Sequence, residues 1–226
     1  MTGRLSHLTM ILGLILALGG CSSVRERCSN ALLSPDVKII NYHVKKHYES
    51  IRTLANRLYA KNPCYEPDPE RRRAKIRAIF GETSPYTIPY ELRISMSHQL
   101  LEASFAPTPP ERDRVLVFIL GLKKGIDEAY NTGHGPFLTG CQIDVKRLER
   151  LYSNISQAKW RLKTYRDQGG HLMFITNQAL DNGYINMGFE VILTQMLTRI
   201  QDDIYLRSGL ESNLTFRLST IFLSIL

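Results

Sequence analysis

Apolar residues recur at intervals of three and four along most of the chain, which is the spacing of one face of an α-helix. The first long stripe of this kind consists of Val37, Ile40, Val44, His47, Ile51, Leu54 and Leu58. Ser34-Pro35-Asp36 precedes it with a hydroxyl N-cap, a proline at the first helical position and an acid in the first turn, and Asn62-Pro63 ends it. The sequence therefore predicts a long helix over residues 35–61.

The same spacing predicts further helices, which are separated by joints rich in proline and glycine. They cover residues 69–80, 90–105, 111–131, 142–166 and about 186–207. Helix 111–131 has apolar residues over a broad face, so we expect it to be the central buried helix. Helix 142–166 has a strict 3-4-3-4-3 stripe, which suits packing along a nearly parallel neighbour; the stripe is Leu148, Leu151, Ile155, Ala158, Leu162 and Tyr165.

The segment 214–226 is compatible with two conformations. Leu214, Phe216 and Leu218 alternate like a strand, whereas Leu214, Leu218, Ile221 and Ile225 fit a helix. The helical neighbourhood favours a helix, and about 13 residues are too few to cross a bilayer. The predicted fold class is all-α, with residues 32–226 forming a single multi-helix, bundle-like domain.

The N-terminus differs from the rest of the chain. Arg4 precedes an uninterrupted apolar run over residues 8–18, in which only Thr9 and Gly13 are not strongly hydrophobic. Eleven helical residues rise about 16 Å, while the hydrocarbon core of a bilayer is about 30 Å thick. The run therefore has the length of the hydrophobic region of a signal peptide and is too short for a stable membrane span.

Leu18-Gly19-Gly20-Cys21 follows this run and resembles the lipobox of bacterial lipoproteins. The resemblance covers the leader only. It implies that residues 1–20 are removed and that Cys21 becomes an acylated first residue carrying diacylglycerol and palmitate-like chains, followed by a polar tether over residues 21–31. Three chains would anchor the protein stably. The alternative is an ordinary signal peptide that yields a soluble periplasmic protein.

In the lipoprotein family, an aspartate after the lipidated cysteine favours retention in the inner membrane. Ser22 occupies this position here. The resemblance therefore implies attachment to the bacterial outer membrane on its periplasmic face.

Composition limits the classes of protein to which the chain can belong. With 226 residues, 43% hydrophobic and 22% charged, it is a globular chain of one or at most two domains, which excludes disordered, collagen-like and polytopic membrane proteins. The formal net charge is +8, and removal of the leader takes away only Arg4, leaving 8 − 1 = +7. A positive charge of this size favours an anionic partner or surface.

Basic residues are concentrated in two segments. The first, our candidate for binding an anionic surface, is Arg71, Arg72, Arg73, Lys75 and Arg77; the second is Arg147, Arg150, Lys159, Arg161, Lys163 and Arg166. Lipid headgroups, lipopolysaccharide phosphates or an acidic envelope protein would suit them. The alternative is that they only solvate helix faces. Nucleic acid is not an expected partner for an exported protein.

Export would place the remaining cysteines in an oxidising compartment. Cys64 and Cys141 are each expected near a helix end, and a bridge between them would close about 77 residues (141 − 64), worth roughly 4.5 kcal/mol in the chain-entropy model. Pairing of Cys28 with Cys64 is the alternative, because spacing does not determine connectivity.

No catalytic or metal-binding pattern emerges. His43 and His47 have the spacing of two metal ligands, but the run His-Val-Lys-Lys-His lacks the glutamate of zincins, and a partly buried, hydrogen-bonded histidine is expected at 47. His134 has no identifiable nucleophile partner. Asp202-Asp203, flanked by arginines, is expected to form surface ion pairs along a helix.

Glu211-Ser212 resembles the Glu-Ser dipeptide of lytic transglycosylases, in which a carboxylic acid protonates a glycosidic oxygen. The Gly-Leu-Met-Gln segment that follows it in that family is missing here, so we interpret the match as coincidence.

These observations lead to one main hypothesis: a lipid-anchored, non-enzymatic helical lipoprotein that serves as a scaffold or accessory subunit of an envelope assembly, without cofactor. Two alternatives remain. One is an envelope hydrolase acting on peptidoglycan or lipid, with a cleft that gathers His134, Glu190 or Glu211. The other is a binding module for a small apolar ligand held between helices.

Overall fold

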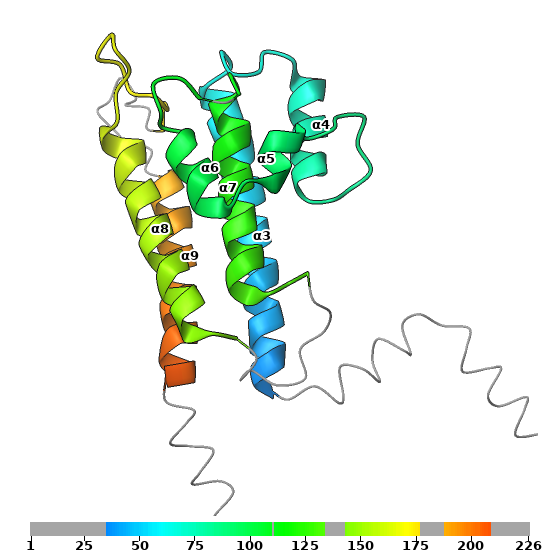
Figure 1. The fold of residues 1–226 in the computed structure, drawn as a ribbon, viewed down its shortest axis with the longest axis vertical. Coiled ribbons are helices and arrows are strands. Elements are labelled where there is room, and N and C mark those ends of the chain that lie inside the picture. Colours follow the sequence, from blue (N-terminus) through cyan, green and yellow to red (C-terminus); the bar gives the residue numbers. More distant parts are fainter. Residues whose placement is uncertain (1–34, 110, 134–142, 177–187, 209–226) are drawn as a thin grey trace, which may run out of the picture.

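The computed structural model describes residues 35–109, 111–133, 143–176 and 188–208, and shows seven helices packed together (Figure 1). Within these residues there is no strand, only an isolated bridge between Arg166 and Leu172. The predicted all-α fold class is confirmed. The helices are α3 (Pro35–Lys61), α4 (Pro69–Ile79), α5 (Tyr90–Ile94), α6 (Ser97–Ala103), α7 (Arg114–Tyr130), α8 (Val145–Thr164) and α9 (Gly188–Ser208).

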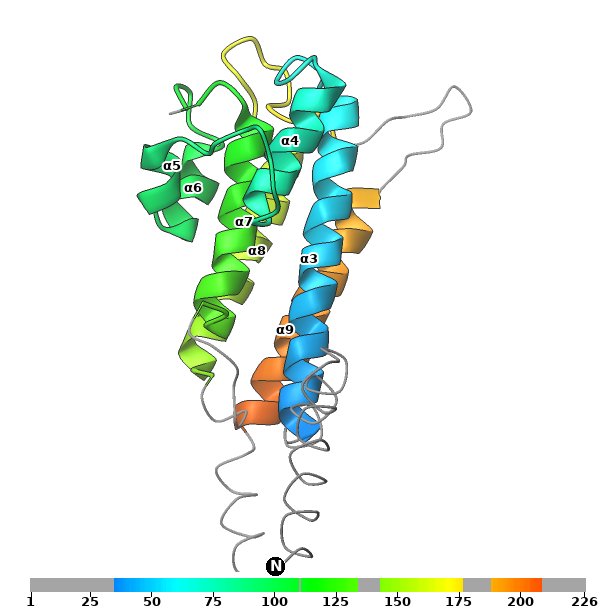
Figure 2. The ribbon, with the colours of Figure 1, turned by 90° about the vertical axis from the view of Figure 1, so that its right-hand side faces the viewer.

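The four long helices α3, α7, α8 and α9 form an up-down-up-down bundle (Figures 1 and 2). Helix α3 begins and α9 ends at the same end of the bundle, which is the lower end in both views. Helix α4 lies in the upper half, beside α3 and α7. The lower end and the α4 side are therefore separated along the long axis of the molecule.

Helix α7 occupies the centre of the fold, as its broad apolar face predicted. Most of its 17 residues are buried, including Phe118 and Leu122, and it packs against α3, α4, α6 and α8. The Asp113 carboxylate caps its N-terminus by accepting a hydrogen bond from the Leu116 amide at 2.9 Å. Asn131 ends it in the left-handed conformation, with φ 53°.

The stripe predicted on helix 142–166 is buried from Leu148 to Leu162 along α8. It packs against α7 and α9 of the same chain. This stripe therefore contributes to the chain's own core and is not a free surface for a partner.

Two glycines allow the helices around α7 to approach it closely. A Cβ atom at Gly121 would lie 3.1 Å from side-chain atoms of Leu100 and Leu101 on α6. A Cβ atom at Gly125 would lie 3.1 Å from Leu151 Cδ1 on α8 and 3.7 Å from Ser97 Cβ. The absence of side chains at these two positions thus sets the spacing of α6 and α8 around α7.

Substitution of Gly121 by valine should lower the free energy of unfolding by about 1–3 kcal/mol, because the added methyl groups would overpack the contact with α6. Chemical denaturation followed by circular dichroism measures this loss. Gly133→Val is the matched control, since no atom lies within 4 Å of a Cβ placed there. Equal stability of the two variants would show that the approach of α6 to α7 does not limit the side chain at 121.

The prediction of one helix over residues 90–105 is wrong, because the structure has two helices there. Ser95 and Met96 adopt extended conformations, with ψ 146° and 157°, between α5 and α6. The Glu128 carboxylate of α7 accepts hydrogen bonds from the backbone amide and the hydroxyl of Ser97, at 2.9 and 2.5 Å. This contact between segments distant in sequence starts a new helix at Ser97, which local periodicity could not reveal.

The other helix predictions agree with the structure to within a few residues at each end. Asp68 caps α4 by accepting a hydrogen bond from the Glu70 amide. The signal peptide, the tether and the segment 214–226 lie outside the described residues. Among the residues that are described, no helix is both long and apolar enough to cross a membrane.

Candidate functional site

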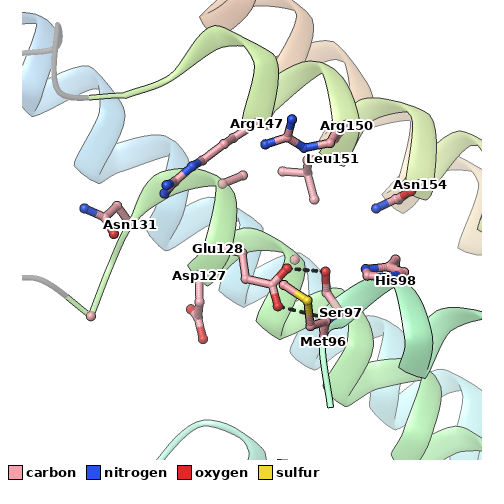
Figure 3. Close-up of a pocket in the computed structure, with 13 residues that line it drawn as sticks. Met96, Ser97, His98, Asp127, Glu128, Asn131, Arg147, Arg150, Leu151 and Asn154 are labelled. Atoms are coloured by element: carbon pink, nitrogen blue, oxygen red, sulfur yellow. Dashed lines mark hydrogen bonds between the residues drawn. The ribbon is translucent and has the colours of Figure 1, made fainter. Parts of the chain in front are cut away.

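A cleft with a volume of about 910 Å³ lies between α6, α7 and α8, in the lower half of the bundle. We call it the α7–α8 cleft. Figure 3 shows polar side chains on both of its sides. It is lined by Met96, Ser97, His98, Gly125, Asp127, Glu128, Ala129, Asn131, Gly133, Arg147, Arg150, Leu151 and Asn154.

One wall of the cleft is a stripe along α8. Arg147, Arg150 and Asn154 follow one another at helical spacing, so their side chains share a face that adjoins Leu151 of the buried stripe (Figure 3). The carboxylate nearest to the Arg147 guanidinium is Asp144, at 3.9 Å. Arg150 forms no ion pair with any described residue. Nearby carboxylates therefore neutralise little or none of the positive charge of these two guanidinium groups.

The carboxylates on the opposite wall already have partners. Glu128 accepts the two hydrogen bonds from Ser97. Asp127 accepts hydrogen bonds from the Tyr48 hydroxyl and the Lys123 ammonium, each at 2.5 Å. Burial, together with the hydrogen bond to Asp127, raises the pKa of Tyr48. The acceptors of this wall are thus occupied, whereas the arginines of the α8 wall can still donate.

The α7–α8 cleft combines these arginines with apolar surface. Leu151 is buried beside Gly125, and Met96 is 54% exposed at the start of α6. Asn131, Asn154 and His98 add polar groups. Such a cleft is suited to a ligand that has both an anionic group and an apolar part.

Lys75 was predicted, with the arginines around it, to bind an anionic surface, but the structure buries it. Only 5% of its side chain is exposed, and its ammonium contacts the carboxylates of Glu66 and Asp113, each at 2.7 Å. Burial alone would lower the pKa of Lys75, but these hydrogen bonds raise it. The Tyr59 hydroxyl also donates to Asp113, at 2.8 Å. Lys75 is a structural cation and is not available to an external surface.

Arg72 is also used within the fold, because its guanidinium donates to the backbone carbonyls of Glu66 and Pro67. The three other arginines are exposed on α4: Arg71, Arg73 and Arg77. Arg71 contacts Glu66 at 3.3 Å, and Arg73 contacts Glu70. The accessible basic surface on α4 is therefore smaller than the run of charges in the sequence indicates.

A second buried polar cluster joins α3, α7 and α9. Asp203 is fully buried, which corrects the expectation of a surface ion pair. Its carboxylate contacts His43 Nδ1 at 3.0 Å, accepts a hydrogen bond from the Tyr130 hydroxyl at 2.7 Å, and contacts Arg207 at 3.1 Å. His47, which was expected to be partly buried, is fully buried, and its Nε2 lies 3.4 Å from the Tyr130 hydroxyl. Burial lowers the pKa of His47 to about 3.

Several predicted positions cannot be placed in the site. Cys21, Cys28, Cys141, His134 and Glu211 lie outside the described residues, so both predicted disulfide pairings remain predictions. Cys64 is exposed after the end of α3. Glu190, which was considered for a hydrolase, forms an ion pair with Lys163 between α9 and α8. Among described residues, no group of three or more His, Cys, Asp or Glu side chains has the arrangement of a metal site.

Comparison of the chain with models of protein families, with curated proteins and with solved structures gives no match.

The α7–α8 cleft was not predicted from the sequence. The only signal was the pair Arg147 and Arg150, which the sequence shows as part of a longer basic segment. The structure separates that segment into several roles. Lys159 donates to Thr194, Lys163 pairs with Glu190, and Arg166 donates to the Gly170 carbonyl.

Proposed function

We propose that the protein is a lipid-anchored lipoprotein of the bacterial envelope, and that its helical domain serves as a scaffold or accessory subunit of an envelope assembly. The lipobox-like sequence ending at Cys21 supports the anchor. The proposed orientation of the domain on the membrane rests on exposed apolar side chains at the lower end of the bundle. This is the end at which the described chain begins after the proposed tether.

Four large apolar or aromatic side chains are exposed near this end, and we call them the apolar rim. They are Ile39 and Tyr42 in the first turns of α3, and Tyr205 and Leu206 in the last turn of α9. Tyr205 is 78% exposed. Tyrosines with apolar neighbours are favoured at the interface between lipid and water.

The proposed anchor would hold this end close to a bilayer. Residues 22–34 separate Cys21 from Pro35, and 13 residues span at most about 45 Å when fully extended. A domain held within this distance can rest its apolar rim on the lipid surface. In that orientation α4, in the upper half of the bundle, faces away from the membrane (Figure 2).

This orientation favours a protein partner over lipid for the exposed arginines of α4. Charges contribute to lipid binding only within about a Debye length of the surface, roughly 8–10 Å. The side chains of Arg73 and Arg77 would lie beyond this range if the lower end contacts the membrane. An acidic surface of an envelope protein is the proposed partner.

The anchor is tested by labelling cells with an alkyne analogue of palmitate. We expect the full chain to incorporate the label, and Cys21→Ala to lose it, because Cys21 provides the acylated thiol and amine. Cys28→Ala is the matched control and should keep the label. Undiminished labelling of Cys21→Ala would contradict the assignment.

The partner is tested by placing a photoreactive amino acid at Arg77 and, separately, at Tyr205. We expect a discrete protein adduct from position 77 that disappears in the Arg71→Glu/Arg73→Glu background, and no such adduct from position 205. A pattern in which position 77 gives no adduct, or in which its adduct is unaffected by the charge reversals, would remove the support for a partner at α4.

A further inference from the structure

We propose that the α7–α8 cleft binds a phosphate-bearing ligand, with the phosphate held by Arg147 and Arg150 and the remainder of the ligand lying against the apolar surface of Leu151 and Met96. The inference depends on the contacts within the cleft and not on the lipid anchor. It therefore goes beyond the proposed scaffold function and can fail or hold independently of it.

Two guanidinium groups lie side by side on the α8 wall of the cleft. Arg147 and Arg150 are one helical turn apart on α8, and both side chains line the cleft (Figure 3). Each guanidinium offers several N–H donors in a planar fork, which matches the oxygens of a phosphate better than an ammonium does. Two such groups can together satisfy most of the oxygens of one phosphate.

The positive charge of the two arginines is free to meet an anion. Arg150 has no carboxylate partner among the described residues, and the contact of Arg147 with Asp144 is 3.9 Å long. The two carboxylates across the cleft accept hydrogen bonds from groups other than the arginines, Asp127 from Lys123 and Tyr48, and Glu128 from Ser97. An anion entering the cleft can therefore pair with the arginines without first displacing an internal carboxylate.

The rest of the cleft surface has room and contacts for a second part of the ligand. A cleft of about 910 Å³ is much larger than a phosphate ion, so the ligand must have a second part. Met96 and Leu151 offer apolar contacts, and Asn131, His98 and Asn154 offer hydrogen bonds to polar atoms beside them. A glycerophosphate headgroup with the first carbons of its chains has this combination, as does a soluble phosphate ester with an apolar substituent.

The test is native mass spectrometry of the full-length protein in a nonionic detergent, titrated with phosphatidylglycerol, with phosphatidylcholine and with phenyl phosphate. We expect binding of phosphatidylglycerol or phenyl phosphate that weakens as ionic strength rises. A lipid headgroup as the ligand predicts binding of phosphatidylglycerol alone, and a soluble phosphate ester with an apolar substituent predicts binding of phenyl phosphate.

The variant Arg147→Gln/Arg150→Gln should weaken this binding at least tenfold, and Arg150→Gln alone should give a smaller loss. The matched control is Arg112→Gln/Lys146→Gln, which removes the same charge from exposed positions outside the cleft and should stay within twofold of the wild type. A melting temperature close to the wild-type value shows that each variant is folded.

Three results would overturn the proposal: no binding of either anionic probe, an equal loss in the control variant, or binding of phosphatidylcholine as strong as that of phosphatidylglycerol. Labelling of Cys21 is measured separately, so failure of the anchor and failure of the cleft are distinguishable.

Discussion

Replacement of Lys75 by methionine should lower the free energy of unfolding by about 3–5 kcal/mol, which is a large part of the stability of a typical domain. Methionine keeps most of the side-chain volume but removes the cation that joins Glu66 and Asp113. Both carboxylates are buried. Asp113 would lose its ion pair where water cannot replace it, and Glu66 would keep only its contact with the exposed Arg71. Urea denaturation of the full chain, followed by circular dichroism, measures the loss.

Two further variants make this result specific to the buried charge. Arg77→Met removes an exposed cation from the same helix and should change the free energy of unfolding by no more than about 0.5 kcal/mol. Lys75→Arg keeps the charge and should be less harmful than Lys75→Met. If Lys75→Met were as stable as Arg77→Met, the cluster would not contribute to stability in the way its geometry indicates.

The second large effect is a dependence of stability on pH that arises from His47. The folded protein holds this imidazole neutral, because burial lowers its pKa from about 6.5 to about 3. In the unfolded chain the same group takes up a proton near pH 6.5. As the pH falls below 6.5, the unfolded state gains a proton that the folded state does not, so the free energy of unfolding decreases by about 1.4 kcal/mol for each pH unit until about pH 3.

This contribution amounts to roughly 2 kcal/mol between pH 7 and pH 5. It should be missing in His47→Gln, which keeps a hydrogen-bonding group beside Tyr130 but does not titrate. The measurement is the free energy of unfolding at a series of pH values, and the comparison is the slope, so a uniform loss of stability in the variant does not affect it. His98→Gln, on the exposed side of α6, is the matched control and should keep the wild-type slope.

The charged groups around His47 do not reverse the sign of this effect. Arg199 and His43 lower its pKa further, and only Asp203 opposes them. Glu66 adds to the acid sensitivity: burial alone would raise its pKa, but Lys75 lowers it below the usual value, so its stabilising ion pair is lost as the pH falls through that lowered pKa. Equal slopes for wild type and His47→Gln would show that His47 is protonated in the folded state as readily as in the unfolded state.

The two buried polar clusters show why the local sequence pattern did not predict which charged residues are buried. Lys75 belongs to a run of basic residues whose members look alike in the sequence, yet it is buried because Asp113 and Glu66 come to it from segments after and before α4. Asp203 likewise adjoins Asp202 and resembles a surface residue, but it meets His43 and Tyr130 from two other helices. Asp113 is 38 residues from Lys75, and His43 is 160 residues from Asp203, so the local sequence pattern could not show either contact.

The sequence by itself determined the all-α fold class and the position of nearly every long helix, because a period of 3.6 and the capping residues act within a few positions of one another. It also identified α7 as the central helix, and it carries the lipobox-like segment at Cys21, on which the proposed anchor depends. Only the tertiary structure decided where the predicted helix 90–105 breaks, which basic residues are buried, and that α6, α7 and α8 enclose a cleft. These features depend on side chains that meet across distant segments, such as Glu128 with Ser97 and Lys75 with Asp113, and such pairings leave no periodic signal along the chain.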